Sequence, residues 1–277
     1  MRRSFTTNEF YHIFDRGVDK RKIFLDNRDY IRFIHDLYEF NDINPAPEFS
    51  RCYREEKRED KAKNVGSRVS HIRVSHIKRV SHIKLEEDMR RRRKRVGRRQ
   101  GRVELVRVHG FVLMPNHHHL VVEQIKEGGV SLFMRKLHSG YTNAFNLRYK
   151  RKGHLFQGPF KSIHVENDIH LGFLICYLHS NPLDLWKINW KKNKLTDSET
   201  KGALKFLEKY RWSSHPDYLG LKNFPSLINK ALISKALISK EFLLEFFDGR
   251  EGYKDFFVDW LSQYKKNISY LKELIFD

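Results

Sequence analysis

The chain has 277 residues, with 54 Lys and Arg against 34 Asp and Glu, and a formal net charge of +20 at pH 7. This charge favours a polyanionic partner, and nucleic acid fits better than a membrane, because no apolar run approaches the roughly 18 residues of a membrane span. The first residues lack the apolar core of a signal peptide, and Cys52 and Cys176 allow at most one bridge, so we expect a cytoplasmic protein without structural disulfides.

The N-terminal part predicts one strand and one helix. Residues 10–14 alternate as a strand would, and turn residues follow at 15–19. Acidic and amide residues at 26–29 are typical of a helix cap, and the helix predicted over 30–40 has one apolar stripe. Arg16, in the turn, is a candidate phosphate contact, and a solvated turn residue is an equal alternative.

Residues 48–102 differ from the rest in composition. Residues 51–104 contain twenty Lys and Arg and eight Asp and Glu, a net +12, which is more than half of the charge of the chain. Three near-copies of one pentapeptide, at 68–72, 73–77 and 79–83, indicate tandem duplication, and a basic run follows at 89–99. We interpret 48–102 as an insertion. Its basic run either contacts DNA phosphates without sequence specificity or forms a solvated loop.

Two strands joined tightly at Pro115-Asn116 are predicted for 103–113 and 117–123. In a strand, residues two apart share a face, so His117 and His119 point one way and His118 the other. Two imidazoles on one face can hold a divalent ion, although an isolated pair is more often surface or core.

A helix predicted over 131–146 precedes a stretch, 148–162, that interleaves basic and aromatic residues. Such a stretch suits single-stranded DNA that stacks on rings between cations. The candidate DNA contacts are Arg151, His154, Gln157 and Lys161, whereas Phe156 and Phe160 fit the core equally well. Tyr141 and Tyr149 are rival candidate nucleophiles, but neither is followed four residues later by an amide.

Residues 168–181 have apolar residues at helical spacing, and Pro182 ends the pattern. Tyr177 and Asn181 are four residues apart, so they share one face of the predicted helix. An amide oxygen is a suitable ligand for Mg²⁺ or Mn²⁺. Beyond a polar linker, residues 241–247 predict a helix in a small C-terminal extension over 221–277.

The motifs Met114-Pro115-Asn116-His117-His118-His119 and Tyr177-Leu178-His179-Ser180-Asn181-Pro182 together resemble the single-tyrosine HUH transposases, most closely the REP-associated tyrosine transposases. The resemblance covers residues 5–47 and about 103–220, including a Trp-Ser-Ser segment at 212–214. It departs from the family at His118, where relatives usually have an apolar residue. It implies an α+β, ferredoxin-like sandwich, with a central antiparallel sheet and helices on one face.

The resemblance also implies roles for single residues. His117, His119 and Asn181 would bind a divalent metal, Mg²⁺ or Mn²⁺, and Tyr177 would attack a DNA phosphate to give a 5′-phosphotyrosine. Single-stranded or hairpin DNA would be the partner. Some relatives exchange the tyrosine helix between two chains, which leaves a homodimer open.

We therefore predict three parts: a catalytic domain over 1–47 and 103–220, the basic insertion over 48–102, and the helical extension over 221–277. Two alternatives stay open. One is a regulatory nucleic-acid-binding protein that keeps the transposase fold without cutting DNA. The other is a metal-dependent nuclease in which water attacks and Tyr177 belongs to the core.

Overall fold

The computed structural model describes residues 4–44, 103–192, 194–221, 223 and 241–271. The chain divides into two compact units, residues 1–41 with 104–277, and residues 42–103. The duplicated pentapeptides and the basic run at 89–99 lie outside the described residues. In the smaller unit the described ends meet, since the amide of Ile43 donates to the carbonyl oxygen of Val103 at 2.9 Å.

The larger unit is built on a four-stranded antiparallel sheet in the order β2-β3-β1-β4. Its strands are β1 (Phe10–Arg16), β2 (Val106–Met114), β3 (His117–Gln124) and β4 (Lys161–Val165). The strands β2 and β3 form a hairpin whose two connecting residues are Pro115 and Asn116, as predicted. A bulge between Val108 and Gly110 shifts the register of this hairpin.

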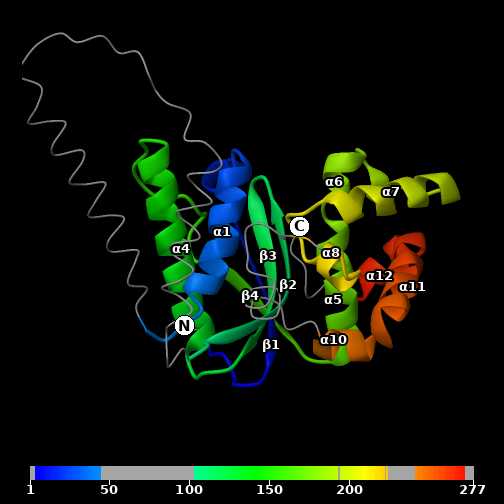
Figure 1. Cartoon of the computed structure of the whole chain (residues 1–277), viewed down its shortest axis with the longest axis horizontal. Helices are drawn as coiled ribbons and strands as arrows, with labels where there is room; N and C mark the ends of the chain where they lie inside the picture. Colours follow the sequence, from blue (N-terminus) through cyan, green and yellow to red (C-terminus); the bar gives the residue numbers. More distant parts are fainter. Residues whose placement is uncertain (1–3, 45–102, 193, 222, 224–240, 272–277) are drawn as a thin grey trace, which may run out of the picture. The chain divides into compact units, whose positions relative to one another are not determined.

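Helices cover both faces of this sheet (Figure 1). On one face lie α1 (Asn27–Glu39) and α4 (Gly129–Arg148), which pack on each other, and on the other lies α5 (Asp168–Ser180). The predicted α+β sandwich is confirmed, but the expectation of helices on one face is wrong. The strands β1, β2 and β3 carry buried apolar side chains on both faces, for example Ile13 and Phe14 of β1, so each face needs a covering layer.

A glycine lets α5 approach the sheet closely. Gly110 of β2 faces α5, and a Cβ atom at this position would stand 2.6 Å from Cδ1 of Ile175. The missing side chain thus creates the space that Ile175 fills. Cys176 is buried on the same helix, which agrees with its interpretation as a small core hydrophobe.

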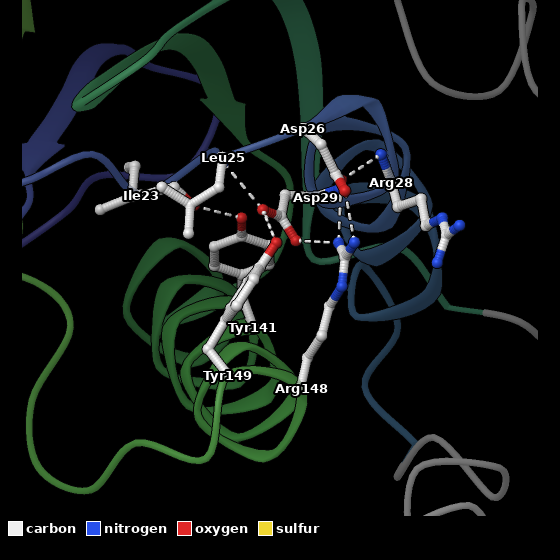
Figure 2. Close-up of polar contacts among 8 residues, drawn as sticks. All are labelled: Ile23, Leu25, Asp26, Arg28, Asp29, Tyr141, Arg148 and Tyr149. Atoms are coloured by element: carbon white, nitrogen blue, oxygen red, sulfur yellow. Dashed lines mark hydrogen bonds and ion pairs between the residues drawn. The ribbon is translucent and has the colours of Figure 1, made fainter. Parts of the chain in front are cut away.

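The start of α1 and the end of α4 are tied together by polar contacts (Figure 2). Asp26 caps α1 by accepting from the amides of Arg28 and Asp29, as the acidic residues before the helix predicted. Arg148, the last residue of α4, binds the carboxylates of both Asp26 and Asp29. The hydroxyl of Tyr149, a rival candidate nucleophile, donates to the carboxylate of Asp29 at 2.8 Å, so it takes part in holding α4 to α1.

The other rival, Tyr141, is buried in α4 and donates its hydroxyl to the carbonyl oxygen of Ile23 at 2.6 Å. Figure 2 shows it beside Tyr149, next to the start of α1. Both rival tyrosines therefore belong to the joint between α1 and α4.

The remaining elements are one short helix before α1 and the helices that follow α5. These are η1 (Val18–Lys20, before α1), α6 (Leu183–Trp186), η2 (Trp190–Lys192), α7 (Asp197–Lys209), α8 (His215–Tyr218), α10 (Glu241–Phe246), α11 (Gly249–Ser262) and α12 (Tyr264–Ser269). The predicted helix over 241–247 is confirmed as α10. The extension packs on α5, where Phe173 contacts Phe256 and Trp260 at ring-centroid distances of 5.7 and 5.5 Å.

The Trp-Ser-Ser segment lies along the free edge of β2. Ser213 forms an antiparallel bridge with Val112, and the amide of Leu113 donates to the carbonyl oxygen of Trp212 at 2.9 Å. The indole of Trp212 stacks on Tyr30 of α1. In the parts of the chain that the structure describes, no helix has the length and apolar character needed to span a membrane.

Candidate active site

The predicted histidine pair lies on β3, on the sheet face that α5 covers. In the register of β1 and β3, His119 stands opposite Phe14 and His117 opposite Arg16. The rings of His117 and His119 are 5.1 Å apart between centroids and nearly perpendicular. The alternation read from the sequence therefore holds, with His119 buried and His117 partly exposed.

Each of these histidines is held through its Nδ1 atom. The Nδ1 of His119 forms a 2.9 Å hydrogen bond with Nε2 of His12 on β1, and the Nδ1 of His117 forms a 2.8 Å hydrogen bond with Oδ1 of Asn116. A hydrogen bond at Nδ1 orients the ring and directs the second nitrogen, Nε2, away from it.

The environment of His119 favours its neutral form. Burial holds the pKa of His119 well below its ordinary value of 6.5, and the neighbouring His117 lowers it further. Metal binding requires an unprotonated imidazole nitrogen, so a histidine in this environment needs to lose no proton near neutral pH.

Tyr177 comes from α5, which begins at its cap Asn167. Its ring lies nearly perpendicular to that of His119, with 5.8 Å between centroids, and 6.3 Å from that of His12. The side chain is 1% exposed, so a phosphate can reach it only after the groups over it move. The structure thus brings Tyr177 and His119 together across the boundary between helix and sheet.

Asn181 follows the last residue of α5. Its Nδ2 donates to the carbonyl oxygen of Tyr177 at 2.9 Å, and its backbone amide donates to the same oxygen at 3.2 Å. Because Nδ2 makes this bond, the amide oxygen Oδ1 is the atom of Asn181 with ligand character. The structure describes no group of three or more His, Cys, Asp or Glu side chains that could hold a metal, so a site here would need this amide.

His118 points to the other face, as the alternation predicted. It is buried against Phe33 of α1, His138 of α4 and Phe156, and neither ring nitrogen has a hydrogen-bond partner among the described residues. Burial keeps its pKa well below the ordinary value, so the ring is neutral. His118 is therefore a core residue, at the position where the sequence departs from the apolar residue that the resemblance leads one to expect.

The candidate DNA contacts lie at three places. Arg16 and Gln157 are joined by a 2.5 Å hydrogen bond from Nε to Oε1, both exposed at the end of β1. Arg151 instead donates to Asn146 at 2.7 Å and to the carbonyl oxygen of His154 at 3.2 Å. Lys161, exposed on β4, lies with its ammonium 5.9 Å from the ring centre of Phe14.

Of the two phenylalanines in the same stretch, Phe156 is buried and Phe160 is half-buried. Phe156 is buried and stacks on His138 at 4.1 Å between centroids, and Phe160 contacts Phe5 at 6.2 Å. Phe156 therefore belongs to the core, one of the two alternatives that the sequence left open.

Sequence reasoning missed His12. Its position in the first strand was noted only as part of an alternating pattern, whereas the structure sets it against both His119 and Tyr177. A signal existed, since a polar residue inside an otherwise apolar strand is unusual. Its partner, however, depends on how two strands 107 residues apart are paired.

The fold and site together define an α+β protein in which a paired-histidine strand faces a tyrosine helix. A family model described as "Transposase IS200 like" matches residues 67–181, which include β2, β3, α4, β4, α5 and Asn181. The segment that carries both motifs is thus similar to the IS200-like transposases, in agreement with the resemblance noted in the sequence. The match begins within the stretch predicted as an insertion and leaves β1 outside.

A search of curated proteins found no match. A solved structure described as a REP-associated tyrosine transposase bound to a REP hairpin aligns with a TM-score of 0.41 and 11% identity. The alignment covers 83% of this chain and 94% of that chain.

Proposed function

We propose that this protein is a transposase that cuts and rejoins single-stranded DNA with Tyr177 as the nucleophile. The observation that carries the proposal is the position of the Tyr177 ring across His119, 5.8 Å between centroids, in a segment that matches the IS200-like transposases. The amide of Asn181, one helical turn after Tyr177, is the third member of the group.

The donor set fits a catalytic divalent ion. Mg²⁺ or Mn²⁺ would be held by His117, His119 and the amide oxygen of Asn181, and three protein ligands leave positions open for a phosphate. Bound there, the ion supplies Lewis-acid polarisation of phosphate oxygens. The hydrogen bonds that His119 makes with His12, and His117 with Asn116, orient the two rings for this purpose.

The residues of the chain perform a transesterification. The phenol oxygen of Tyr177 forms a bond to the phosphorus of one DNA phosphodiester, and the bond from phosphorus to the 3′ oxygen breaks. The phenol proton leaves and the 3′ oxygen gains one, so the products are a 5′-phosphotyrosine and a free 3′-hydroxyl. Attack by another 3′-hydroxyl on the same phosphorus reverses the step and joins strands without a nucleotide cofactor.

The DNA strand would be bound by the cationic side chains near the site. Arg16 with Gln157 at the end of β1, and Lys161 on β4, are exposed. The strand β1 pairs with the histidine strand β3, and β4 pairs with the other edge of β1. Arg151 and His154 would extend this contact. Such groups position phosphates without reading sequence.

One observation favours a second candidate, a protein that binds nucleic acid without cutting it. Tyr177 is 1% exposed and His119 is buried, which is the environment of core residues. On this alternative the net charge of +20 serves binding alone.

The decisive experiment is incubation with labelled hairpin and single-stranded DNA in Mn²⁺ or Mg²⁺, followed by a denaturing gel. We expect an adduct that survives denaturation, requires the metal, and disappears in both Tyr177→Phe and His119→Ala. Tyr149→Phe is the matched control, since it removes a tyrosine hydroxyl away from the site and should keep the adduct.

Binding without an adduct or a cut product would instead support the second candidate. Cutting that persists in Tyr177→Phe would identify water as the nucleophile.

A further inference from the structure

A second polar group lies behind α5, apart from the candidate active site. It consists of His179 of α5, Ser214 and His215 at the start of α8, and Tyr253 of α11, and we call it the α5–α11 polar chain. All four side chains are buried. The proposed reaction uses none of them, and buried polar groups in such number carry a cost unless they are bonded to one another.

The members form a continuous series of short hydrogen bonds. The hydroxyl of Tyr253 lies 2.6 Å from Nδ1 of His215 and 2.7 Å from Nδ1 of His179. The Nε2 of His179 lies 2.7 Å from Oγ of Ser214. Oγ of Ser214 is in turn bonded to Phe111 of β2, accepting from its amide at 3.0 Å and lying 3.3 Å from its carbonyl oxygen.

One arrangement of the protons satisfies every donor. Nδ1–H of His215 donates to the oxygen of Tyr253, whose hydroxyl donates to Nδ1 of His179. Nε2–H of His179 then donates to Ser214, whose hydroxyl donates to the carbonyl of Phe111. Nε2 of His215, which has no partner among the described residues, is left as a bare acceptor. The reverse arrangement would leave a buried N–H without a partner there, which costs more.

The position of His179 connects this chain with the candidate active site. His179 follows Tyr177 by two residues, so the two side chains leave the helix on roughly opposite sides. Tyr177 points to His119 and His12 on the sheet, while His179 points to Ser214 and Tyr253. The chain of bonds thus joins the last turn of α5 to β2, the strand that leads through the hairpin to His117.

We propose that Tyr253 is a positioning residue for Tyr177, acting through His179. The C-terminal extension would then hold the last turn of α5 in the rotation and height at which the phenol meets the histidine strand. This inference rests on the proposed function for its catalytic consequence, but its structural part can be tested separately. A misplacement of about 1 Å in a reacting group can cost about a hundredfold in rate.

The test compares Tyr253→Phe with Tyr270→Phe in the full-length protein. The first substitution removes the bridging hydroxyl and keeps the ring. The second removes a hydroxyl from a half-exposed tyrosine of the same extension, whose ring also contacts α5, at Phe173. Hydrogen exchange of backbone amides in the segment 173–183 and the rate of adduct formation at saturating hairpin DNA are measured for both.

We expect Tyr253→Phe to speed exchange in 173–183 and to slow adduct formation by about tenfold or more, with unchanged half-saturating DNA concentration. Tyr270→Phe should match the wild type in both. Ser214→Ala removes the hydrogen bond to the other nitrogen of His179. Its effect on the rate of adduct formation should therefore be less than additive with the effect of Tyr253→Phe. A hydroxyl that served only global stability would lower the melting temperature without this coupling.

The outcomes separate the two proposals. If the wild type forms no adduct with any DNA, the proposed function fails, and the exchange rates alone decide whether Tyr253 holds α5. If the wild type is active and Tyr253→Phe equals Tyr270→Phe in exchange or in adduct rate, the positioning role of Tyr253 is overturned.

Discussion

His12 determines which nitrogen of His119 can bind a metal. The Nδ1 of His119 and Nε2 of His12 share one hydrogen bond, so only one of these atoms carries the proton. For Nε2 of His119 to bind a metal, Nδ1 must carry that proton and donate it to His12. His12 thus acts as an acceptor behind the candidate ligand.

Replacing His12 should therefore weaken metal binding without removing a ligand. We expect His12→Phe to lower Mn²⁺ affinity by about 10- to 100-fold, which is the usual effect of losing such a partner. His12→Gln, whose side-chain oxygen can accept from His119, is the matched control and should keep most of the affinity. Titration calorimetry with Mn²⁺ measures both, and equal affinity in His12→Phe and the wild type would exclude this role.

Polar contacts join α1 to α4. These two helices form the layer on the sheet face opposite α5, the helix that carries Tyr177. Arg148 reaches both carboxylates at the start of α1 (Figure 2). Asp29 is buried, and it also accepts from the amide of Leu25 at 2.8 Å. Loss of Arg148 would leave this buried carboxylate without its guanidinium partner, which costs more than the loss of an exposed ion pair.

We expect Arg148→Met to lower the free energy of unfolding by about 1–3 kcal/mol at pH 7, chiefly through Asp29. Arg28→Met, at the start of the same helix, is the control and should change the free energy of unfolding little. The hydrogen bond that Figure 2 draws from Arg28 to Asp26 uses only the backbone amide of Arg28. Urea denaturation followed by circular dichroism measures both. Equal loss in the two variants would contradict the assignment.

The contact between Arg148 and Asp26 also makes the stability of the fold depend on pH. The hydrogen bond from Arg148 lowers the pKa of Asp26 below its ordinary value of 3.8. A lowered pKa stabilises the fold above pH 3.8, and this contribution is lost as the pH falls through the lowered value. Asp26 is half exposed, so its share is small, and Arg148→Met should reduce the slope of stability against pH in this acid range.

For the whole molecule, the basic segment is the main source of charge. Residues 51–101 contain nineteen Lys and Arg and seven Asp and Glu, a net +12 of the total of +20. If this segment contacts DNA phosphates, its charges release counterions on binding and make the affinity strongly dependent on salt. If it is a solvated loop, the affinity depends on the rest of the chain.

Replacing residues 51–101 with a short Gly/Ser linker tests this alternative, and the bond between Ile43 and Val103 shows that the flanking ends are close enough to join. We expect weaker binding of hairpin DNA and a shallower dependence of log Kd on log salt concentration. The adduct formed at saturating DNA is the control and should persist. An unchanged salt dependence would assign the segment to the solvated loop.

The sequence by itself determined the local features of this protein. Alternation of side chains set His117 and His119 on one face and His118 on the other, and helical spacing set Asn181 one turn after Tyr177, because both periods are properties of the local backbone. The hairpin at Pro115-Asn116 and the helix that Asp26 caps followed from neighbouring residues in the same way.

Only the tertiary structure decided which distant residues meet. The pairing of β1 with β3 brought His12 to His119, the packing of α5 on the face opposite α1 and α4 set Tyr177 over the histidine strand, and the docking of α11 joined Tyr253 to His179. Local periodicity carries no information on these contacts. They depend on strand order and on the faces that helices cover, which are set by burial of apolar surface over the whole larger unit.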